Sequence, residues 1–350
     1  MKKVLILVFA LTILALIALT VGGCPAPTPP QKTYEWKIQS EWPRGDLSVA
    51  LLDGFADSVA EKSNGQMKIT VFAEPEIVPM DQVIDACVRG TIEMMHGGGT
   101  VAQAIVPSGV VEFGLPYAYE IQPGVDLATR GEKLHDWFFA SGYADIFREE
   151  YGKQGLYYLD IHSYGPCNIF LSKRPVTKIE DFKGLKVRSE GIWTEQEAQV
   201  GAIGTADIGP GDTYMGLKTG ALDATVWDVS AITGLKWHEV APYWVRGLET
   251  DCIGHIQVNM KAWNELPDNL KQVLREAAEE YWYMTIDGYG TEVQTVENMV
   301  KTGEVKASQL DENAIKILRE NAYILWDEVA NQDAASAQAV KLLKEWRGIE

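Results

Sequence analysis

Hydrophobic and polar positions follow two different periods along the chain after residue 33. Apolar side chains alternate with polar ones near residues 34–38 and 67–71, which predicts strands there, and a third strand is expected over 92–95. Apolar residues recur at helical spacing in the stretch that follows Asp46, which we expect to cap that helix, and again over 80–89. This β-α-β-α-β order predicts an α/β fold with a mostly parallel sheet and helices on both faces.

Part of this pattern recurs further along the chain. Ile77–Asp81 and Ile208–Asp212 each precede a helical stretch, and each stretch is followed by a glycine and an aliphatic–acid pair at 90–93 and 220–223. We expect the aspartate of each segment to cap its helix and the glycine to end it. The repeat predicts two similar α/β domains that enclose a ligand cleft at the carboxyl ends of their strands.

The C-terminal third is predicted to be helical. A long helix is expected from Asp268 to about Met299, with a weak point at Gly288–Gly290, and further helices over 311–330 and 334–346. About 30 residues at the helical rise cover roughly 45 Å, enough to cross two domains. We therefore expect one α/β domain from 34–160 plus about 248–285. The other takes 161–247 plus about 286–350 with the C-terminal helices, and hinge strands and the long helix join the two.

The N-terminus indicates the compartment. Two lysines precede an apolar run from Val4 to Val21, and small residues lead directly to Cys24, which predicts a secretory signal over 1–23. The small residues before the cysteine resemble a bacterial lipobox, which implies lipid attachment at Cys24. The proline-rich stretch 24–33 favours an extended tether. An uncleaved transmembrane anchor is the alternative, since the run is nearly long enough to span a bilayer. Either interpretation places the globular part outside the cytoplasm.

Charge and cysteine content exclude several classes. The 350 residues include 49 acidic and 31 basic side chains, for a net charge of −18, without a basic patch, so nucleic acid is not an expected partner. The four cysteines form no CxxC pair, which argues against a zinc site. With Cys24 lipidated, Cys87, Cys167 and Cys252 remain, and buried thiols are favoured over one disulfide.

Catalytic motifs are absent from the sequence. It contains no GxSxG, HExxH or phosphate-loop motif, and its five histidines are scattered. His96 is expected to pack or line a cleft wall, and Gly97–Gly99 to let a ligand approach the backbone. Glu195 and Glu197 are expected on a solvated helix face. An enzyme is therefore not favoured.

One cation stands out in this acidic chain. The segment 179–191 predicts a turn and then a strand that ends at Arg188, followed by a helix capped by Thr194 and Glu197. An arginine at a strand end beside a cleft is suited to grip a carboxylate through two parallel hydrogen bonds. The alternative is that Arg188 pairs internally with Glu190 or another nearby acid.

The segment Glu180–Arg188 resembles the central motif of the DctP-type solute-binding proteins of TRAP transporters. Further matches, in the family's order over about residues 34–300, are Glu61–Gly65, Pro210–Asp223 and Trp263–Pro267. The resemblance implies two α/β domains, a hinge, a long spanning helix and closure on an organic acid, with the arginine at position 188 gripping the carboxylate. It also implies the small and large integral membrane subunits of a permease as partners.

Two departures from the family pattern bear on the ligand. Members that bind 2-oxo acids with a metal carry a Glu-Trp pair where this chain has Val226-Trp227, so bound calcium or sodium is not expected, with substitution by Asp228 as the alternative. Sialic-acid-type members carry a second arginine near position 167, which here is Cys167.

Because the chain lacks these family features, aromatic residues become the main candidates for the walls of the cleft. Trp42, Trp193 and Trp227 are expected at strand ends beside the cleft, with packing in the core as the alternative, and Tyr164 is a further candidate. One arginine among indoles suggests a monocarboxylate with an apolar or aromatic body. The predicted function is a lipid-anchored extracytoplasmic solute receptor without a required cofactor. A secreted lipoprotein enzyme acting on an acid or ester and a ligand-sensing receptor partner are the alternatives.

Overall fold

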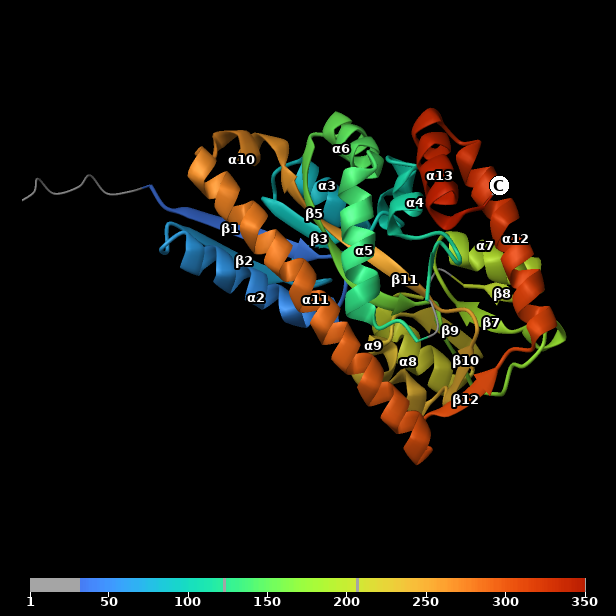
Figure 1. Cartoon of the computed structure of the whole chain (residues 1–350). Helices are drawn as coiled ribbons and strands as arrows, with labels where there is room; N and C mark the ends of the chain where they lie inside the picture. Colours follow the sequence, from blue (N-terminus) through green and yellow to red (C-terminus); the bar gives the residue numbers. More distant parts are fainter. Residues whose placement is uncertain (1–31, 122–123, 206–207, 350) are drawn as a thin grey trace, which may run out of the picture. The chain divides into compact units, whose positions relative to one another are not determined.

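Two mixed β-sheets, each flanked by helices, organise the chain (Figure 1). The computed structural model describes residues 32–121, 124–205 and 208–349. The predicted signal segment, Cys24 and most of the proline-rich tether lie outside the described residues. Residues 35–350 form one compact unit that holds the candidate sites. The helices of the described residues are all too short or too polar to span a bilayer.

The first sheet has the strand order β2-β1-β3-β11-β4, and β5 pairs with β11. Its strands are β1 (Tyr34–Ser40), β2 (Met67–Phe72), β3 (Met94–Gly97), β4 (Tyr119–Glu120), β5 (Leu156–Cys167) and β11 (Thr250–Asn259). β1 and β3 are parallel, whereas β11 is antiparallel to β3, β4 and β5. The sheet is therefore mixed rather than mostly parallel as expected, because β11 returns from the second sheet to the first.

Helices cover this first sheet, and together they form the first lobe. They are α2 (Leu47–Lys62), α3 (Val83–Val88), α4 (Gly109–Phe113), α5 (Leu127–Ala140) and α6 (Tyr143–Lys153), with 3₁₀ turns η1 (Met80–Gln82) and η2 (Val101–Ala104). Asp46 caps α2 as predicted, since its carboxylate accepts a bond from the Ser48 amide at 2.9 Å.

The second sheet has the order β12-β10-β6-β9-β7-β8 and forms the second lobe with its helices. Its strands are β6 (Ile169–Ser172), β7 (Lys186–Arg188), β8 (Ile203–Gly204), β9 (Ala224–Trp227), β10 (Tyr243–Arg246) and β12 (Lys306–Gln309). Its helices are α7 (Ile192–Gln199), α8 (Pro210–Thr219) and α9 (Ser230–Thr233), with turns η3 (Ile179–Phe182) and η4 (Trp237–Glu239).

The predicted repeat is present in the topology of both sheets. The order β2-β1-β3 in the first sheet corresponds to β8-β7-β9 in the second, with an antiparallel strand following each. The expected caps are wrong, however. Pro79 and Gly209 occupy the N-cap positions, while Asp81 and Asp212 lie in the first turn, where an acid still favours the helix dipole.

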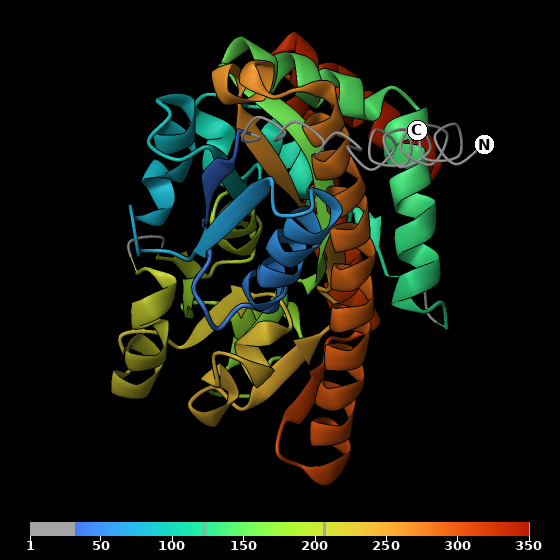
Figure 2. The ribbon, with the colours of Figure 1, turned by 90° about the vertical axis from the view of Figure 1, so that its left-hand side faces the viewer.

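One long helix accompanies both lobes. Helix α11 (Asp268–Thr302) runs unbroken for 35 residues, about 50 Å, through the glycines that were expected to weaken it. It packs on β5, α2 and α5 of the first lobe and on α9 of the second. Figure 2 shows this orange helix running from the upper part of the view to its lower end.

The remaining helices are α10 (Met260–Glu265), α12 (Glu312–Ala330) and α13 (Ala334–Arg347). Helix α12 packs on α7 of the second lobe, and α13 packs on α4 and α6 of the first. The C-terminal helices thus contact both lobes, and the sequence-based division at the bounds given above stays a prediction. Cys87, Cys167 and Cys252 are buried free thiols, as favoured from the sequence.

The chain crosses between the lobes in β-strand connections close to a cavity. β5 ends at Cys167 and β6 begins at Ile169, so Asn168 alone joins them, with a left-handed φ of 54°. Asparagine tolerates this conformation better than most residues. The return crossing passes through Gly247, whose φ is 108°. These two short connections and α11 link the two lobes.

Candidate functional site

A small cavity of about 50 Å³ lies where the two lobes meet. Its walls come from the chain just after β1, from α4 and its neighbourhood, from the end of β5, and from the ends of β7 and β9. The lining residues are Trp42, Thr100, Phe113, Tyr164, Cys167, Asn168, Arg188, Glu190, Trp193, Val226 and Trp227. The structure thus brings together five of the six side chains predicted for the ligand site.

Arg188 ends β7, as predicted, and its side chain is only 2% exposed. Its Nε donates to the Ile208 carbonyl at 3.1 Å, and its guanidinium carbon lies 4.8 Å from the centroid of the Trp227 ring. A terminal nitrogen forms an ion pair with Glu190. The internal pairing that the sequence analysis kept as an alternative is therefore present, inside the same cavity that holds Arg188.

Aromatic rings form most of the remaining wall. Trp42 stacks on Tyr164 with ring centroids 4.3 Å apart, and Phe113 lies 5.7 Å from Tyr164. Trp227 ends β9 and Trp42 follows β1, in agreement with the expected strand-end positions. Trp193 is not at a strand end as expected. It lies in the first turn of α7 and lines the cavity from there.

Two of the predicted residues are engaged away from the cavity. The Tyr164 hydroxyl donates to Asp46 at 2.8 Å, so that only its ring faces the cavity. Asp228 is fully buried and does not line the cavity, because its carboxylate accepts bonds from Ser230 and from Tyr289 at 2.7 Å. Burial and the nearby Asp46 hold the pKa of Asp228 well above its usual range.

The donor set of the cavity does not fit a metal ion. Val226 presents an apolar wall at the position where metal-binding relatives were expected to carry a carboxylate, and Asp228, the suggested substitute, is held by Ser230 and Tyr289. Within the described ranges, no group of three or more His, Cys, Asp or Glu side chains is arranged to hold a metal.

The glycine run 97–99 serves packing and not ligand approach. A β-carbon on Gly98 would lie 2.5 Å from Phe113 and 3.3 Å from Trp42, and one on Gly97 would meet the Glu41 carboxylate. Glu41 is fully buried, accepts a bond from the Gly98 amide at 2.9 Å, and has a second oxygen without a partner. Burial holds the pKa of Glu41 well above its usual range, with the charge of Glu190 adding to the effect.

Glu197 is buried, contrary to the expected solvated face, whereas Glu195 is exposed. Gly191, not Thr194, precedes α7, so the predicted capping box is absent. Instead, Ser189 lies between the two side chains, donating to the Glu197 carboxyl at 2.7 Å and lying 2.9 Å from the Thr194 hydroxyl. Burial raises the pKa of Glu197 to about 8 against the lowering influence of Arg188.

His96 belongs to the packing of the first lobe. It stacks on His162 with centroids 4.1 Å apart, and its two ring nitrogens lie at 2.9 and 3.0 Å from Ser40 and Tyr281. Burial lowers the pKa of His162 to about 3, so this histidine is neutral. Neither ring lines the cavity.

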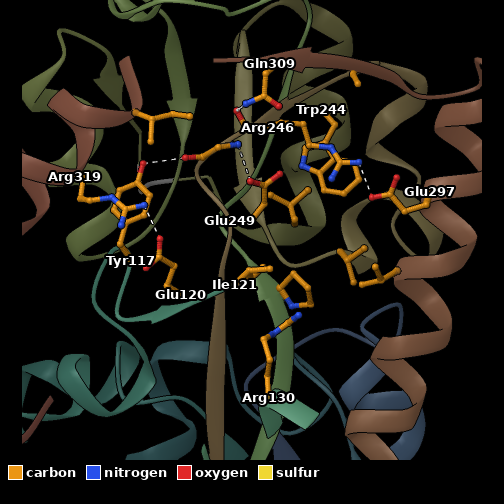
Figure 3. Close-up of a pocket in the computed structure, with 17 residues that line it drawn as sticks. Tyr117, Glu120, Ile121, Arg130, Trp244, Arg246, Glu249, Glu297, Gln309 and Arg319 are labelled. Carbon is orange, nitrogen blue, oxygen red and sulfur yellow. Dashed lines mark hydrogen bonds and ion pairs between the residues drawn. The ribbon is translucent and has the colours of Figure 1, made fainter. Parts of the chain in front are cut away.

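A second cavity, of about 610 Å³, lies near the same strand crossings (Figure 3). Pro166 and Ile169 line it, whereas Cys167 and Asn168 between them line the smaller one. Its three arginines already have acidic partners at 2.6–2.7 Å: Arg130 with Asp251, Arg246 with Glu297, and Arg319 with Glu120. Because all three arginines are already paired with acids, the larger cavity has little free positive charge to bind an anion.

Sequence reasoning missed several residues of the small cavity. Thr100, Phe113 and Asn168 carried no signal that separates them from ordinary turn or core residues. Glu190 was considered only as a partner for Arg188. Its position two residues after a strand-end arginine was the available signal, since it places both side chains at one edge of the sheet.

A ligand cavity between two hinged α/β lobes is the architecture of a solute-binding receptor. The family model described as "Bacterial extracellular solute-binding protein, family 7" (DctP) matches residues 38–333. This chain belongs to that family, and is a TRAP-type solute-binding protein.

Individual relatives are distant but nearly full-length. A monocarboxylate 2-oxoacid-binding periplasmic protein of Nostoc sp. is 23% identical over 319 residues, which are 89% of this chain and 84% of the relative. A TRAP solute-binding protein of Colwellia psychrerythraea, solved with calcium and pyruvate, is 23% identical with a TM-score of 0.79, over 90% and 94% of the two chains. One of Chromohalobacter salexigens, solved with (S)-2-amino-1-propanol, is 21% identical with a TM-score of 0.79, over 90% and 96%.

Proposed function

We propose that this protein captures an organic carboxylate outside the cytoplasm and delivers it to the small and large integral membrane subunits of a TRAP permease. The ligand is a monocarboxylate whose body is apolar or aromatic. The observation that carries the proposal is the buried guanidinium of Arg188 at the wall of a cavity built largely from aromatic rings.

Arg188 is suited to this role by its fixed geometry. The bond from Nε to the Ile208 carbonyl and the contact with Trp227 orient the planar guanidinium, so its terminal nitrogens face the cavity edge where Glu190 lies. A planar fork of this kind binds a carboxylate with two parallel hydrogen bonds. An incoming carboxylate replaces, or shares the arginine with, the Glu190 carboxylate.

The relatives support a transport role without fixing the ligand. The Nostoc protein is named for 2-oxo acids, and the other two were solved with pyruvate and an amino alcohol. These ligands differ in charge, so the ligand class must be argued from the cavity of this chain. The receptor role needs no chemical step: the ligand bridges the two lobes, and the permease recognises the closed form.

The membrane anchor belongs to the same proposal. Cleavage before Cys24 and lipidation of its thiol would tether the receptor through the proline-rich stretch 24–33. Mass spectrometry of protein expressed with its N-terminus intact tests this. A diacylglyceryl mass on a peptide that begins at Cys24, lost in Cys24→Ser, supports lipidation, and an unmodified Cys24 rules it out.

The receptor function is tested by a thermal-shift screen of the purified protein against a broad library of carboxylates. A ligand at a hundredfold excess over its Kd adds about 2.7 kcal/mol, which for this chain length raises Tm by roughly 4 °C. The shift should vanish in Arg188→Ala and persist in Arg174→Ala, a matched exposed arginine of the second lobe. An unchanged shift in Arg188→Ala would refute the assignment of Arg188.

A further inference from the structure

The carboxylate of Glu190 lies in the small cavity beside the arginine expected to bind the ligand. Its side chain is 26% exposed, it lines the cavity, and it forms an ion pair with Arg188. Of the described residues that line this cavity, Arg188 is the single base and Glu190 the single acid. The cavity wall is therefore neutral overall, and not the positive site that a simple anion would favour.

Charge counting separates two kinds of ligand. A plain carboxylate brings the cavity to a net charge of −1, with two carboxylates competing for one guanidinium in a largely buried space. Buried charges are unfavourable unless each has an opposite partner. A ligand that carries both a carboxylate and an ammonium group leaves the cavity neutral and gives every charge an opposite neighbour.

The aromatic wall fits the same kind of ligand. Trp42, Phe113, Tyr164, Trp193 and Trp227 surround the cavity. The face of an aromatic ring attracts cations within about 6 Å, and most strongly when water is excluded. One ring of this wall already makes a cation–π contact, since the guanidinium carbon of Arg188 lies 4.8 Å from the centroid of the Trp227 ring. The other rings are available to an ammonium group that faces Glu190.

We propose that the ligand is a compact zwitterion, an ammonium acid whose carboxylate binds Arg188 while its positive nitrogen lies between Glu190 and the aromatic wall. This inference rests on the proposed carboxylate-receptor function and changes the ligand proposed there by adding a positive nitrogen to the monocarboxylate. The cavity volume of about 50 Å³ restricts the ligand to a small molecule. Glu190 then acts as a specificity residue that selects the positive nitrogen.

Isosteric pairs of ligands test the proposal directly. Glycine betaine and 3,3-dimethylbutanoate share a shape and a carboxylate but differ in one positive nitrogen, and proline and cyclopentanecarboxylate form a second pair. Calorimetric titration of the purified protein with each pair, alongside the carboxylate library, gives the affinities. We expect the ammonium member of at least one pair to bind ten- to hundredfold more tightly. Glu190→Gln should reduce this preference to about threefold or less, and Glu180→Gln, at an exposed acid of the same lobe, should leave it unchanged.

Several results would overturn the inference while leaving the receptor function intact. One is that the carbon isosteres bind as tightly as the ammonium acids or more tightly. A second is that Glu190→Gln binds all acids more tightly by the same factor. A third is that only acids without a positive nitrogen bind in the library screen. Binding that survives Arg188→Ala would refute the assignment of Arg188 as the carboxylate-binding residue, and a library in which no acid binds would overturn the carboxylate-receptor function itself. Thermal unfolding of each variant without ligand confirms that a lost preference does not reflect misfolding.

Discussion

Tyr289 on the long helix α11 donates a hydrogen bond of 2.7 Å to Asp228, the residue that follows β9 in the second lobe. The same hydroxyl lies 3.4 Å from Asp46, which caps α2 in the first lobe. Each aspartate also binds the amide and hydroxyl of a serine two residues later, Ser48 or Ser230. One phenol therefore contacts a buried carboxyl group from each lobe.

Replacing Tyr289 by phenylalanine should destabilise the protein by about 1–3 kcal/mol, because the fully buried Asp228 carboxyl loses a hydrogen-bond donor. Urea denaturation monitored by tryptophan fluorescence measures the loss. Tyr283→Phe is the matched control, since Tyr283 lies on the same helix with 48% exposure. Equal stability of both variants would contradict the structural role of Tyr289.

Glu197 should make the protein less stable as pH rises. Its pKa of about 8 in the folded protein lies above the ordinary value of 4.5, so the folded state holds a proton that the unfolded state releases. This contribution is fully present below pH 4.5 and is lost as pH rises through about 8, with a slope of at most about 1.4 kcal/mol per pH unit.

Denaturation of Glu197→Gln between pH 5 and 9 checks this dependence. The glutamine cannot ionise, so the variant should lose that part of the pH slope and gain stability relative to the natural protein at pH 8–9. Glu180→Gln, at an exposed acid, should keep the natural slope. An identical pH profile for Glu197→Gln and the natural protein would argue against a protonated buried Glu197.

Gly98→Ala should disturb the aromatic wall of the small cavity. The added β-carbon would lie 2.5 Å from Phe113, so the ring must shift at a cost of about 1–3 kcal/mol and ligand affinity should fall. Gly152→Ala is the matched control, because Gly152 lies in α6 with no neighbouring atom within 4 Å of an added β-carbon. That control should gain roughly 0.5–1 kcal/mol of stability. Denaturation measures the change in stability, and ligand titration measures the change in affinity. Unchanged stability and affinity in Gly98→Ala would show that the Phe113 ring can move without cost.

Filling the larger cavity should favour the closed form. Residues 166–169 at the strand crossing contribute to both cavities. We therefore expect a rotation of the lobes that opens the small cavity to narrow the larger one. A tryptophan at Ala307, an exposed residue of β12 that lines the larger cavity, would obstruct that narrowing. We expect Ala307→Trp to bind ligand several-fold more tightly with slower dissociation, and Ala307→Ser to match the natural protein. Weaker binding by a folded Ala307→Trp would exclude this coupling.

The sequence by itself determined the local elements and the place of the key cation. Asp46 caps its helix because the capping bond reaches only two residues along the chain, and α11 follows from helical spacing sustained over 35 residues. The position of Arg188 at a strand end could be predicted because the alternation of apolar and polar residues before it and the turn after it are both local signals. The repeat was visible in the sequence because both copies contain a helix that ends at a glycine and leads into a parallel strand.

Only the tertiary structure decided which side chains surround the small cavity and in what charge state. The sequence left open whether Arg188 pairs with Glu190, and it placed Glu197 on a solvated face. It also gave no reason to bring Phe113 and Asn168 to Trp42, or to fill the space at Gly97 and Gly98 with Glu41 and Phe113. These features depend on contacts between segments far apart in the chain. Burial, which raises the pKa of Glu41 and Glu197, exists only once these segments have packed.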